Sequence, residues 1–240
     1  MKRILFALLA ATALQASVSA QTTTIKDANA EPREVRNFHG IRIGNAFDVF
    51  LSQGNEESVA VSASDTKYMA DIKVEVKDGI LHISYEPKTG RWNSGNKKLK
   101  AYISFKQVST LNVSGACDVD IIGAWKADDL KIDLSGASDL KGRLEAKKLD
   151  IDLSGASDMV VTGSAGQIAI EASGASSFKG FDLVTDYCDA RASGASDIRI
   201  TVNKELSAQA SGASDIDYKG EGVIRDLKSS GASSVSKKNS

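Results

Sequence analysis

The stretch LDIDLSGASDM (149–159) carries a motif that returns throughout the second half of the chain. The intervals between the first serines of successive copies are 21, 19, 19, 20, 18 and 19 residues. A near-constant period of this size is typical of a solenoid, in which each repeat stacks on the next. SGAC appears once and SGAS six times, with first serines at Ser114, Ser135, Ser154, Ser173, Ser193, Ser211 and Ser230.

The residues on both sides of each motif alternate between apolar and polar types, which is typical of strands with one buried face. LKIDL, LDIDL and IAIEA precede three of the motifs, and no part of the repeat has the length or the period of a helix. We therefore predict an all-β fold, a single-stranded right-handed parallel β-helix (β-solenoid) with about 19 residues per coil. A second apolar column follows the motif at Val119, Leu140, Met159, Phe178, Ile198, Ile216 and Val235.

Ser-Gly-Ala suits the corner between the two strands of a coil. Glycine reaches backbone angles that are closed to other residues, and it lets neighbouring coils approach closely. Alanine is small enough to stack on its copy, and serine can hydrogen-bond to backbone groups at the bend. We therefore expect a structural role for the corner glycines, Gly115, Gly136, Gly155, Gly174, Gly194, Gly212 and Gly231.

The two cysteines and one tryptophan have places in this repeat. Cys188 falls in the apolar column of Leu130 and Leu149, and Cys117 falls in the first corner. More than three coils should separate the cysteines, which exceeds the roughly 7 Å between Cα atoms that a disulfide tolerates. We expect two unpaired thiols. Trp125 is expected to cover the side of a coil.

The beginning of the chain predicts export. Lys2 and Arg3 precede an apolar stretch, and the small residues up to Ala20 favour signal-peptide cleavage after Ala20. Residues 1–20 are thus a predicted signal peptide, and 21–35 a flexible segment. No later apolar run reaches the roughly 18 residues of a membrane helix. We expect a protein of the periplasm, the outer surface or the medium, without a membrane span once the signal is removed.

The charge balance argues against nucleic-acid binding. Without Lys2 and Arg3 the chain has 28 basic and 31 acidic residues, a net charge of −3. Nucleic-acid binding needs a concentrated basic face, which this mixed composition does not provide.

Residues 36–113 lack the SGA motif but read as strands. FHGIRI, DVFLSQ and ILHISY alternate or run apolar at strand length, and Asp78-Gly79 predicts a tight hairpin. We expect this part to be an antiparallel sheet that caps the solenoid of residues 114–236, with 237–240 as a short tail.

Three strings together resemble a known family. FHGIRIGNAFDVFLSQG (38–54), VEVKDGILHISYE (74–86) and the repeated SGASD are similar to the GIN domain, the head domain of bacterial auto-transporter adhesins of Bacteroidetes type. The resemblance covers about 36–236. It implies an exported β-solenoid with a role in surface adhesion. It brings no catalytic or cofactor residues to this chain.

Two features are candidate binding sites. The aspartates after the corners should align about 5 Å apart, and divalent cations favour such oxygen clusters. Calcium is the less favoured interpretation, because Ser177 and Ser234 interrupt the row and solvated turn residues have the same pattern. Trp92, in the polar loop KTGRWNSGNKK (88–98), could stack on a sugar or a partner surface. The predicted row consists of Asp118, Asp139, Asp158, Asp197 and Asp215.

Catalysis by a corner serine is not expected. The copies of GAS lack the final glycine of the G-x-S-x-G elbow, and the elbow also needs a strand-to-helix turn. We predict a non-enzymatic cell-envelope or surface protein, an adhesin-like module for an unknown protein or glycan, with no cofactor. The alternative is a structural or stress-associated envelope protein without a dedicated ligand. A polysaccharide-active β-helix enzyme is less favoured, since the short intervals leave no room for a cleft. The oligomeric state stays open.

Overall fold

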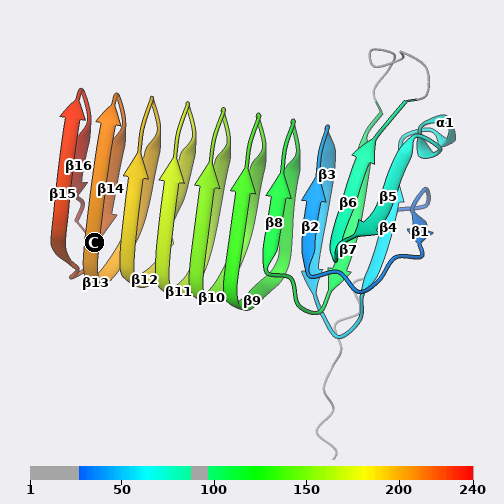
Figure 1. The fold of residues 1–240 in the computed structure, drawn as a ribbon, viewed down its shortest axis with the longest axis horizontal. Helices are drawn as coiled ribbons and strands as arrows, with labels where there is room; N and C mark the ends of the chain where they lie inside the picture. The colour runs from blue at the N-terminus through cyan, green and yellow to red at the C-terminus, as the bar shows by residue number, and fades with distance from the viewer. Residues whose placement is uncertain (1–26, 88–96, 240) are drawn as a thin grey trace, which may run out of the picture.

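The structure is a computed structural model that describes residues 27–87 and 97–239. It is a rod of stacked coils with an antiparallel sheet at one end (Figure 1). The short helix α1 (Thr66–Met69) lies at that end, and no helix of the described residues is long and apolar enough to cross a membrane. The strands are β1 (Glu31–Arg33), β2 (Gly40–Ile43), β3 (Phe47–Gln53), β4 (Ser58–Ser62), β5 (Ile72–Lys77), β6 (Ile80–Tyr85), β7 (Leu99–Phe105), β8 (Thr110–Val113), β9 (Asp118–Leu134), β10 (Asp139–Leu153), β11 (Asp158–Ala172), β12 (Ser177–Ala192), β13 (Asp197–Gly212), β14 (Asp215–Lys219), β15 (Val223–Gly231) and β16 (Ser234–Lys237).

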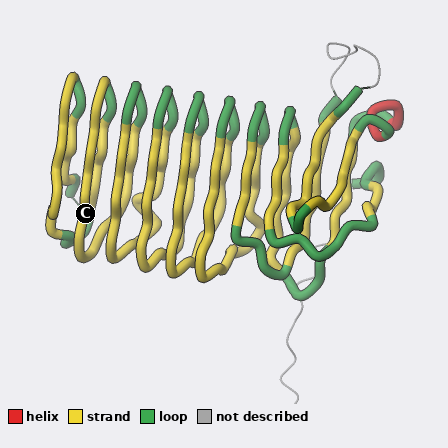
Figure 2. Tube along the Cα trace, viewed as in Figure 1, coloured by secondary structure: helices red, strands yellow, loops and turns green. Residues whose placement is uncertain are grey.

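The repeat forms the predicted parallel solenoid. Strands β9 to β13 pair in parallel with their neighbours in sequence, and the register aligns equivalent positions, such as Leu149 with Ile168. Each of these strands begins just after one corner and continues through a rounded bend to the next corner. The tight corners therefore form one edge of the rod, drawn as loops in Figure 2, and the bends form the other. The right-handed sense of the coil stays a prediction.

The core is made of stacked apolar columns that narrow toward the C-terminal coils. Ala190 and Ala208 replace the larger residues of earlier coils, whereas Phe178 and Leu183, in the same coil as Ala190, are large and fully buried. The large buried side chains of this coil therefore lie in its first part, and the small ones lie in its second part. Trp125 also lies inside, where its ring packs on Phe105 at 4.8 Å between centroids. The expectation that Trp125 covers the side of a coil was wrong.

Both cysteines are buried and free, as predicted. Cys188 aligns with Ile168 and Leu206 in an apolar column. Burial raises the pKa of both thiols above the ordinary value, so the unreactive protonated form is favoured.

The corner glycines are required by two separate constraints. The seven glycines have φ between 77° and 97°, in the left-handed region that other residues rarely adopt. They also stack closely, since a Cβ added to Gly155 would lie 2.4 Å from the carbonyl oxygen of Gly136. The backbone ladder continues through the corner, where the N–H of Ala156 donates to that same oxygen at 2.7 Å. Only glycine satisfies both conditions.

The second serine of each motif closes the corner from inside. Ser157 is fully buried, and its hydroxyl donates to the carbonyl of Ser154 at 2.9 Å. The same bond spans three residues at Ser138, Ser196 and Ser214. Sequence reasoning considered the first serine and missed this one, although its presence in six of seven copies was the signal.

The predicted antiparallel cap is present but smaller than expected. Strand β5 pairs antiparallel with β6, β4 with β7, and β1 with β4. Asp78 and Gly79 have φ of 51° and 74°, as a two-residue hairpin requires. Within residues 36–113, however, β2 and β3 pair in parallel with β6 and β7. These four strands belong to the solenoid, because they pair in parallel with each other as its coils do.

An eighth corner is hidden in Gly44-Asn45-Ala46, between β2 and β3. Asn45 takes the place of the corner glycine, with φ of 76°, and Ala116 donates its N–H to the Asn45 carbonyl at 2.6 Å. The Asn45 side chain accepts from the backbone N–H of Tyr85 at 2.8 Å. Asparagine tolerates the left-handed region better than other residues with a Cβ, which explains the substitution.

Two glycine variants separate the two constraints on the corner. Gly123 has φ of 80° with no atom within 4 Å of an added Cβ, whereas Gly155 has φ of 77° with the Gly136 carbonyl in the way. We expect Gly123→Ala to lower the free energy of unfolding by about 1 kcal/mol through backbone strain alone. Gly155→Ala should cost at least about 3 kcal/mol, since the coils must also separate. Denaturant titration followed by circular dichroism measures both, and equal losses would contradict the stacking argument.

The two serines of one corner give a second comparison. Ser157→Ala removes a buried hydrogen bond and leaves the Ser154 carbonyl without it, so we expect a loss of about 1 kcal/mol. Ser154→Ala removes only a long 3.5 Å bond to Leu134 on a half-buried side chain. That variant should stay within about 0.5 kcal/mol of the parent protein. Thermal and denaturant unfolding of the two proteins side by side is the measurement, and the reverse order would contradict the assigned roles.

Candidate functional site

The repeat displays its outward side chains on two opposite flanks of the rod. Since side chains alternate along a strand, each coil gives the same outward positions as its neighbours, about 4.8 Å apart. The aspartate flank follows the corners and has the row Asp48, Asp118, Asp139, Asp158, Ser177, Asp197, Asp215 and Ser234. The ladder flank precedes the corners and has the row Asp133, Asp152, Glu171, Arg191, Gln209 and Lys228, beside a second row of Lys131, Asp150, Ala169, Asp189, Ser207 and Asp226.

The predicted aspartates are in register on the aspartate flank. The row begins earlier than predicted, because Asp48 follows the hidden corner and pairs with Asp118. Asp158 forms an ion pair with Lys179 at 2.9 Å, and Asp215 accepts from the Ser234 hydroxyl at 2.6 Å. A hollow of about 460 Å³ lies over the first of these coils.

The metal and loop predictions remain predictions. Among the described residues there is no group of three or more His, Cys, Asp or Glu side chains that could hold a metal ion. The calcium row is therefore a line of single carboxylates, one per coil, partly engaged with Lys179 and Ser234. Trp92 and the cleavage position after Ala20 lie outside the described residues.

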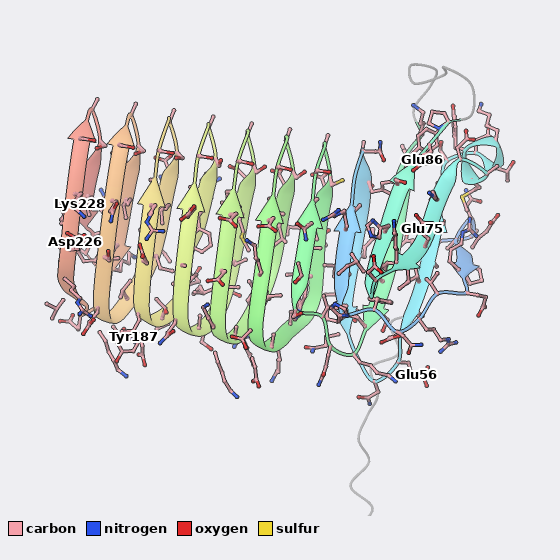
Figure 3. All side chains as sticks on the ribbon, viewed as in Figure 1. Glu56, Glu75, Glu86, Tyr187, Asp226 and Lys228 are labelled. Carbon is pink, nitrogen blue, oxygen red and sulfur yellow. The ribbon has the colours of Figure 1, made fainter. Side chains whose placement is uncertain are left out.

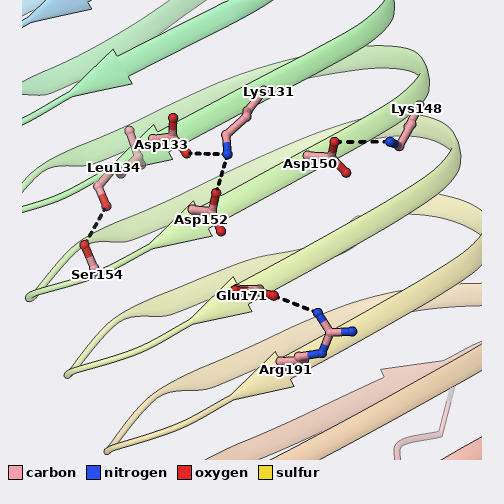
Figure 4. A network of polar contacts seen from close by, with 9 residues as sticks. All are labelled: Lys131, Asp133, Leu134, Lys148, Asp150, Asp152, Ser154, Glu171 and Arg191. Atoms are coloured by element: carbon pink, nitrogen blue, oxygen red, sulfur yellow. Dashed lines mark hydrogen bonds and ion pairs between the residues drawn. The ribbon is translucent and has the colours of Figure 1, made fainter.

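The ladder flank has a network of charges that bridges coils (Figure 4). Lys131 contacts Asp133 at 3.4 Å in its own coil and Asp152 at 2.9 Å in the next. Arg191 contacts Asp189 in its own coil and Glu171 in the coil before, both at 2.7 Å. These cations neutralise carboxylates that the register places directly above one another, such as Asp133 and Asp152.

A groove follows the rod axis along this flank. It has a volume of about 600 Å³ and spans the coils from Asp152 to Lys228. It is lined by small residues at the corners, including Ser154 and Ser173, and by charged side chains such as Arg191. The first-serine hydroxyls here donate to the coil before, as Ser173 does to the Leu153 carbonyl at 3.3 Å. Sequence reasoning did not single out this flank, although the polar positions two before each serine were visible.

The pKa values of the stacked carboxyls of Asp133 and Asp152 are shifted in opposite directions. Burial and the hydrogen bond with Asp152 raise the pKa of Asp133 above its ordinary value. Burial acts in the same direction on Asp152, but hydrogen bonds from Lys131 and Asp133 outweigh it and hold the pKa of Asp152 below its ordinary value. The two carboxyls therefore titrate as a coupled pair, in which Asp133 takes up a proton at a higher pH than Asp152.

Replacement of each aspartate should have a different effect. Because its pKa is raised in the folded state, Asp133 makes a contribution to stability that is lost as pH rises through that pKa. Asp133→Asn should therefore leave the free energy of unfolding at pH 7 unchanged or slightly higher. A lowered pKa means that Asp152 contributes stability that is lost as pH falls through it. Asp152→Asn should therefore lower stability at pH 7 by a few tenths of a kcal/mol, a small value because the pair is partly exposed. Denaturation curves from pH 3 to 8 test this, and a larger loss in Asp133→Asn would contradict it.

Comparisons with known proteins agree with this architecture. A crystal structure described as a "putative adhesin" from Bacteroides fragilis NCTC 9343 is 24% identical, with a TM-score of 0.79 over 87% of this chain and 95% of that chain. A "putative adhesin" from Parabacteroides distasonis ATCC 8503 is 18% identical, with a TM-score of 0.71 over 87% and 95%. A "putative lipid binding protein" from the same strain is 20% identical, with a TM-score of 0.65 over 89% and 98%. At these identities the likeness shows the fold.

The family of this chain follows from a family model that matches most of its length. No individual curated protein matches the chain. The family model described as "Putative auto-transporter adhesin, head GIN domain" matches residues 37–222, which include the cap strands β4 and β5, the hidden corner and the solenoid coils up to β14. This chain is a member of the auto-transporter adhesin head GIN domain family.

Proposed function

We propose that this protein is an exported, non-catalytic binding module of adhesin type that meets a protein or glycan partner through its ladder flank. The observation that carries the proposal is the groove of about 600 Å³, which is lined by side chains of both charges and by small corner residues. Positive donors such as Arg191 and negative acceptors such as Glu171 lie next to each other there. Such a surface offers hydrogen bonds to hydroxyl, amide and charged groups alike.

The rigidity of the flank favours binding. Its side chains stand on continuous parallel strands, and ion pairs such as Lys131 with Asp152 restrain them before a partner arrives. Side chains that are ordered in advance lose less conformational entropy on association. Solenoid proteins commonly use extended surfaces of this kind for binding.

Export and the adhesin role rest on sequence and family. The predicted signal peptide at residues 1–20 supports export, and the family and two structural neighbours are described as adhesins. A structural envelope protein without a ligand is the alternative. It differs in one measurable respect, because it should bind nothing specifically.

A pair of arginine variants tests the ladder flank. Arg191 and Arg199 lie on either side of the corner at Ser193, on the ladder and aspartate flanks respectively. The purified protein is first applied to a glycan array and to a panel of extracellular-matrix proteins to find a ligand. We expect Arg191→Ala to weaken that binding about tenfold or more, since charged hydrogen bonds contribute about 1.5–3 kcal/mol. Arg199→Ala is the matched control and should change it less than about twofold.

The outcomes separate the alternatives. Equal loss in both variants, or loss only in Arg199→Ala, would move the site away from the ladder flank. Absence of specific binding on every surface would support the structural alternative. Release of new reducing ends from any polysaccharide on the array would contradict the non-catalytic assignment.

A further inference from the structure

The two ends of the rod differ in how their edges are covered. At the N-terminal end, antiparallel strands β4 and β5 cover the coil of β6 and β7. At the other end, β15 pairs with β13 and β16 pairs with β14, and no further strand of the described residues pairs with either (Figure 1). An uncovered edge presents backbone donors and acceptors to any strand that fits it.

The edge strand β15 exposes apolar side chains that earlier coils bury. Leu227 aligns with the fully buried Ala208 and Ala190, yet it is 46% exposed, and Ile224 aligns with the fully buried Leu206, yet it is 37% exposed. The other edge strand is protected. It has four residues, and its Lys237 aligns with the buried Tyr218, so a charge stands where the core column would continue. A lysine in this position discourages strand pairing, so β15 is the edge open to a partner.

The backbone pattern says which groups of β15 face outward. In the coils before it, the residue just before the first serine accepts from the next coil, as the Leu153 carbonyl does from the N–H of Ser173 at 2.9 Å. In a parallel ladder the N–H and C=O of one residue point to the same side, and alternate residues share that side. Ser229 and Leu227 therefore direct their N–H and C=O to the open edge.

We infer that β15 pairs with β15 of a second copy, antiparallel, about a two-fold axis at Leu227. In this register Leu227 of each copy exchanges two backbone hydrogen bonds with its equivalent. Asp226 then lies opposite Lys228 of the second copy, and Lys228 opposite its Asp226, so two pairs of opposite charge form. Centring the axis on Asp226 or on Lys228 would instead set like charges against each other. Asp226 and Lys228 stand together on the outer face of the last coil (Figure 3).

The pairing gives a tail-to-tail dimer whose ladder flanks lie on one face. A two-fold axis normal to the sheet places the ladder flank of the second copy on the same face as that of the first. The sheet of β15 therefore continues from one copy to the other. A self-complementary contact of this kind closes on itself and does not grow into a filament. Two ladder flanks on one particle would bind a multivalent surface with higher avidity than one. The dimer itself does not depend on what the ladder flank binds.

Charge reversal at the edge tests the register. Sedimentation velocity of the purified chain over a range of concentrations should show a monomer–dimer equilibrium. Asp226→Lys should weaken the dimer about tenfold or more, because lysines then face lysines in both pairs. The double variant Asp226→Lys/Lys228→Asp should restore it. Asp150→Lys is the matched control, since Asp150 and Lys148 form the same kind of ion pair two residues apart in a middle coil. It should not change the dimer.

A single cysteine provides a second readout. Leu227→Cys places two thiols on the axis, where Cα atoms about 5.5 Å apart allow a disulfide, whereas Cys117 and Cys188 are buried. We expect a disulfide-linked dimer on a non-reducing gel, and none for the control Asp150→Cys. A monomer at all concentrations, or a dimer insensitive to Asp226→Lys, would overturn the proposal. Loss of the dimer without rescue in the double variant would overturn the Leu227 register.

Discussion

The stacking of one left-handed residue on another is the constraint on which this rod depends. At every corner the chain turns through a positive φ while the carbonyl of the preceding corner lies within hydrogen-bond distance of the next alanine N–H. A side chain at that position would occupy the space of the carbonyl oxygen, as the 2.4 Å approach at Gly155 makes clear. The coils can hold their spacing of about 4.8 Å only if the corner has no Cβ in the way. The period of the sequence follows from this, because every coil must return to the same corner.

The same repetition that builds the core creates an electrostatic problem on the surface. Parallel register places equivalent residues one above another, so a repeated aspartate becomes a column of like charges. On the ladder flank, Lys131 lies between Asp133 and Asp152, and Arg191 contacts both Glu171 and Asp189. On the aspartate flank the row is relieved by Lys179 and interrupted by serines. Variation of the polar residues from coil to coil therefore relieves the columns of like charge that an exact repeat would create, while the corner glycine stays the same in every copy.

The parts of this structure that were predictable are those that repeat. Seven copies of SGA with alternating flanks indicated strands, corners, free thiols and a parallel solenoid, because each copy reports the same local physics. The hidden corner was missed since Asn45 replaces glycine there, and with it Asp48, the first member of the aspartate row. The order of coils was also beyond a single sequence. Strands β2 and β3 lie between β6/β7 and β8/β9, which only long-range pairing decides. The ladder flank was not recognised because its residue types vary from coil to coil, although the position two before each corner serine is polar in all of them.

The ends of a solenoid face a requirement that its middle does not. A middle coil has its backbone groups and its apolar column covered on both sides, whereas a terminal coil has one of each exposed. At the N-terminal end the chain meets this requirement with β4, β5 and α1, which interrupt the order of coils and return. At the other end the two edges differ, since Lys237 of β16 aligns with the buried Tyr218 and Leu227 of β15 is exposed. If both edges only needed protection against aggregation, the same device would serve on each. The lysine on β16 and the self-complementary sequence of β15 instead favour one specific partner, a second copy of this chain. That copy can pair along β15, whereas the charge on β16 discourages other strands from adding there.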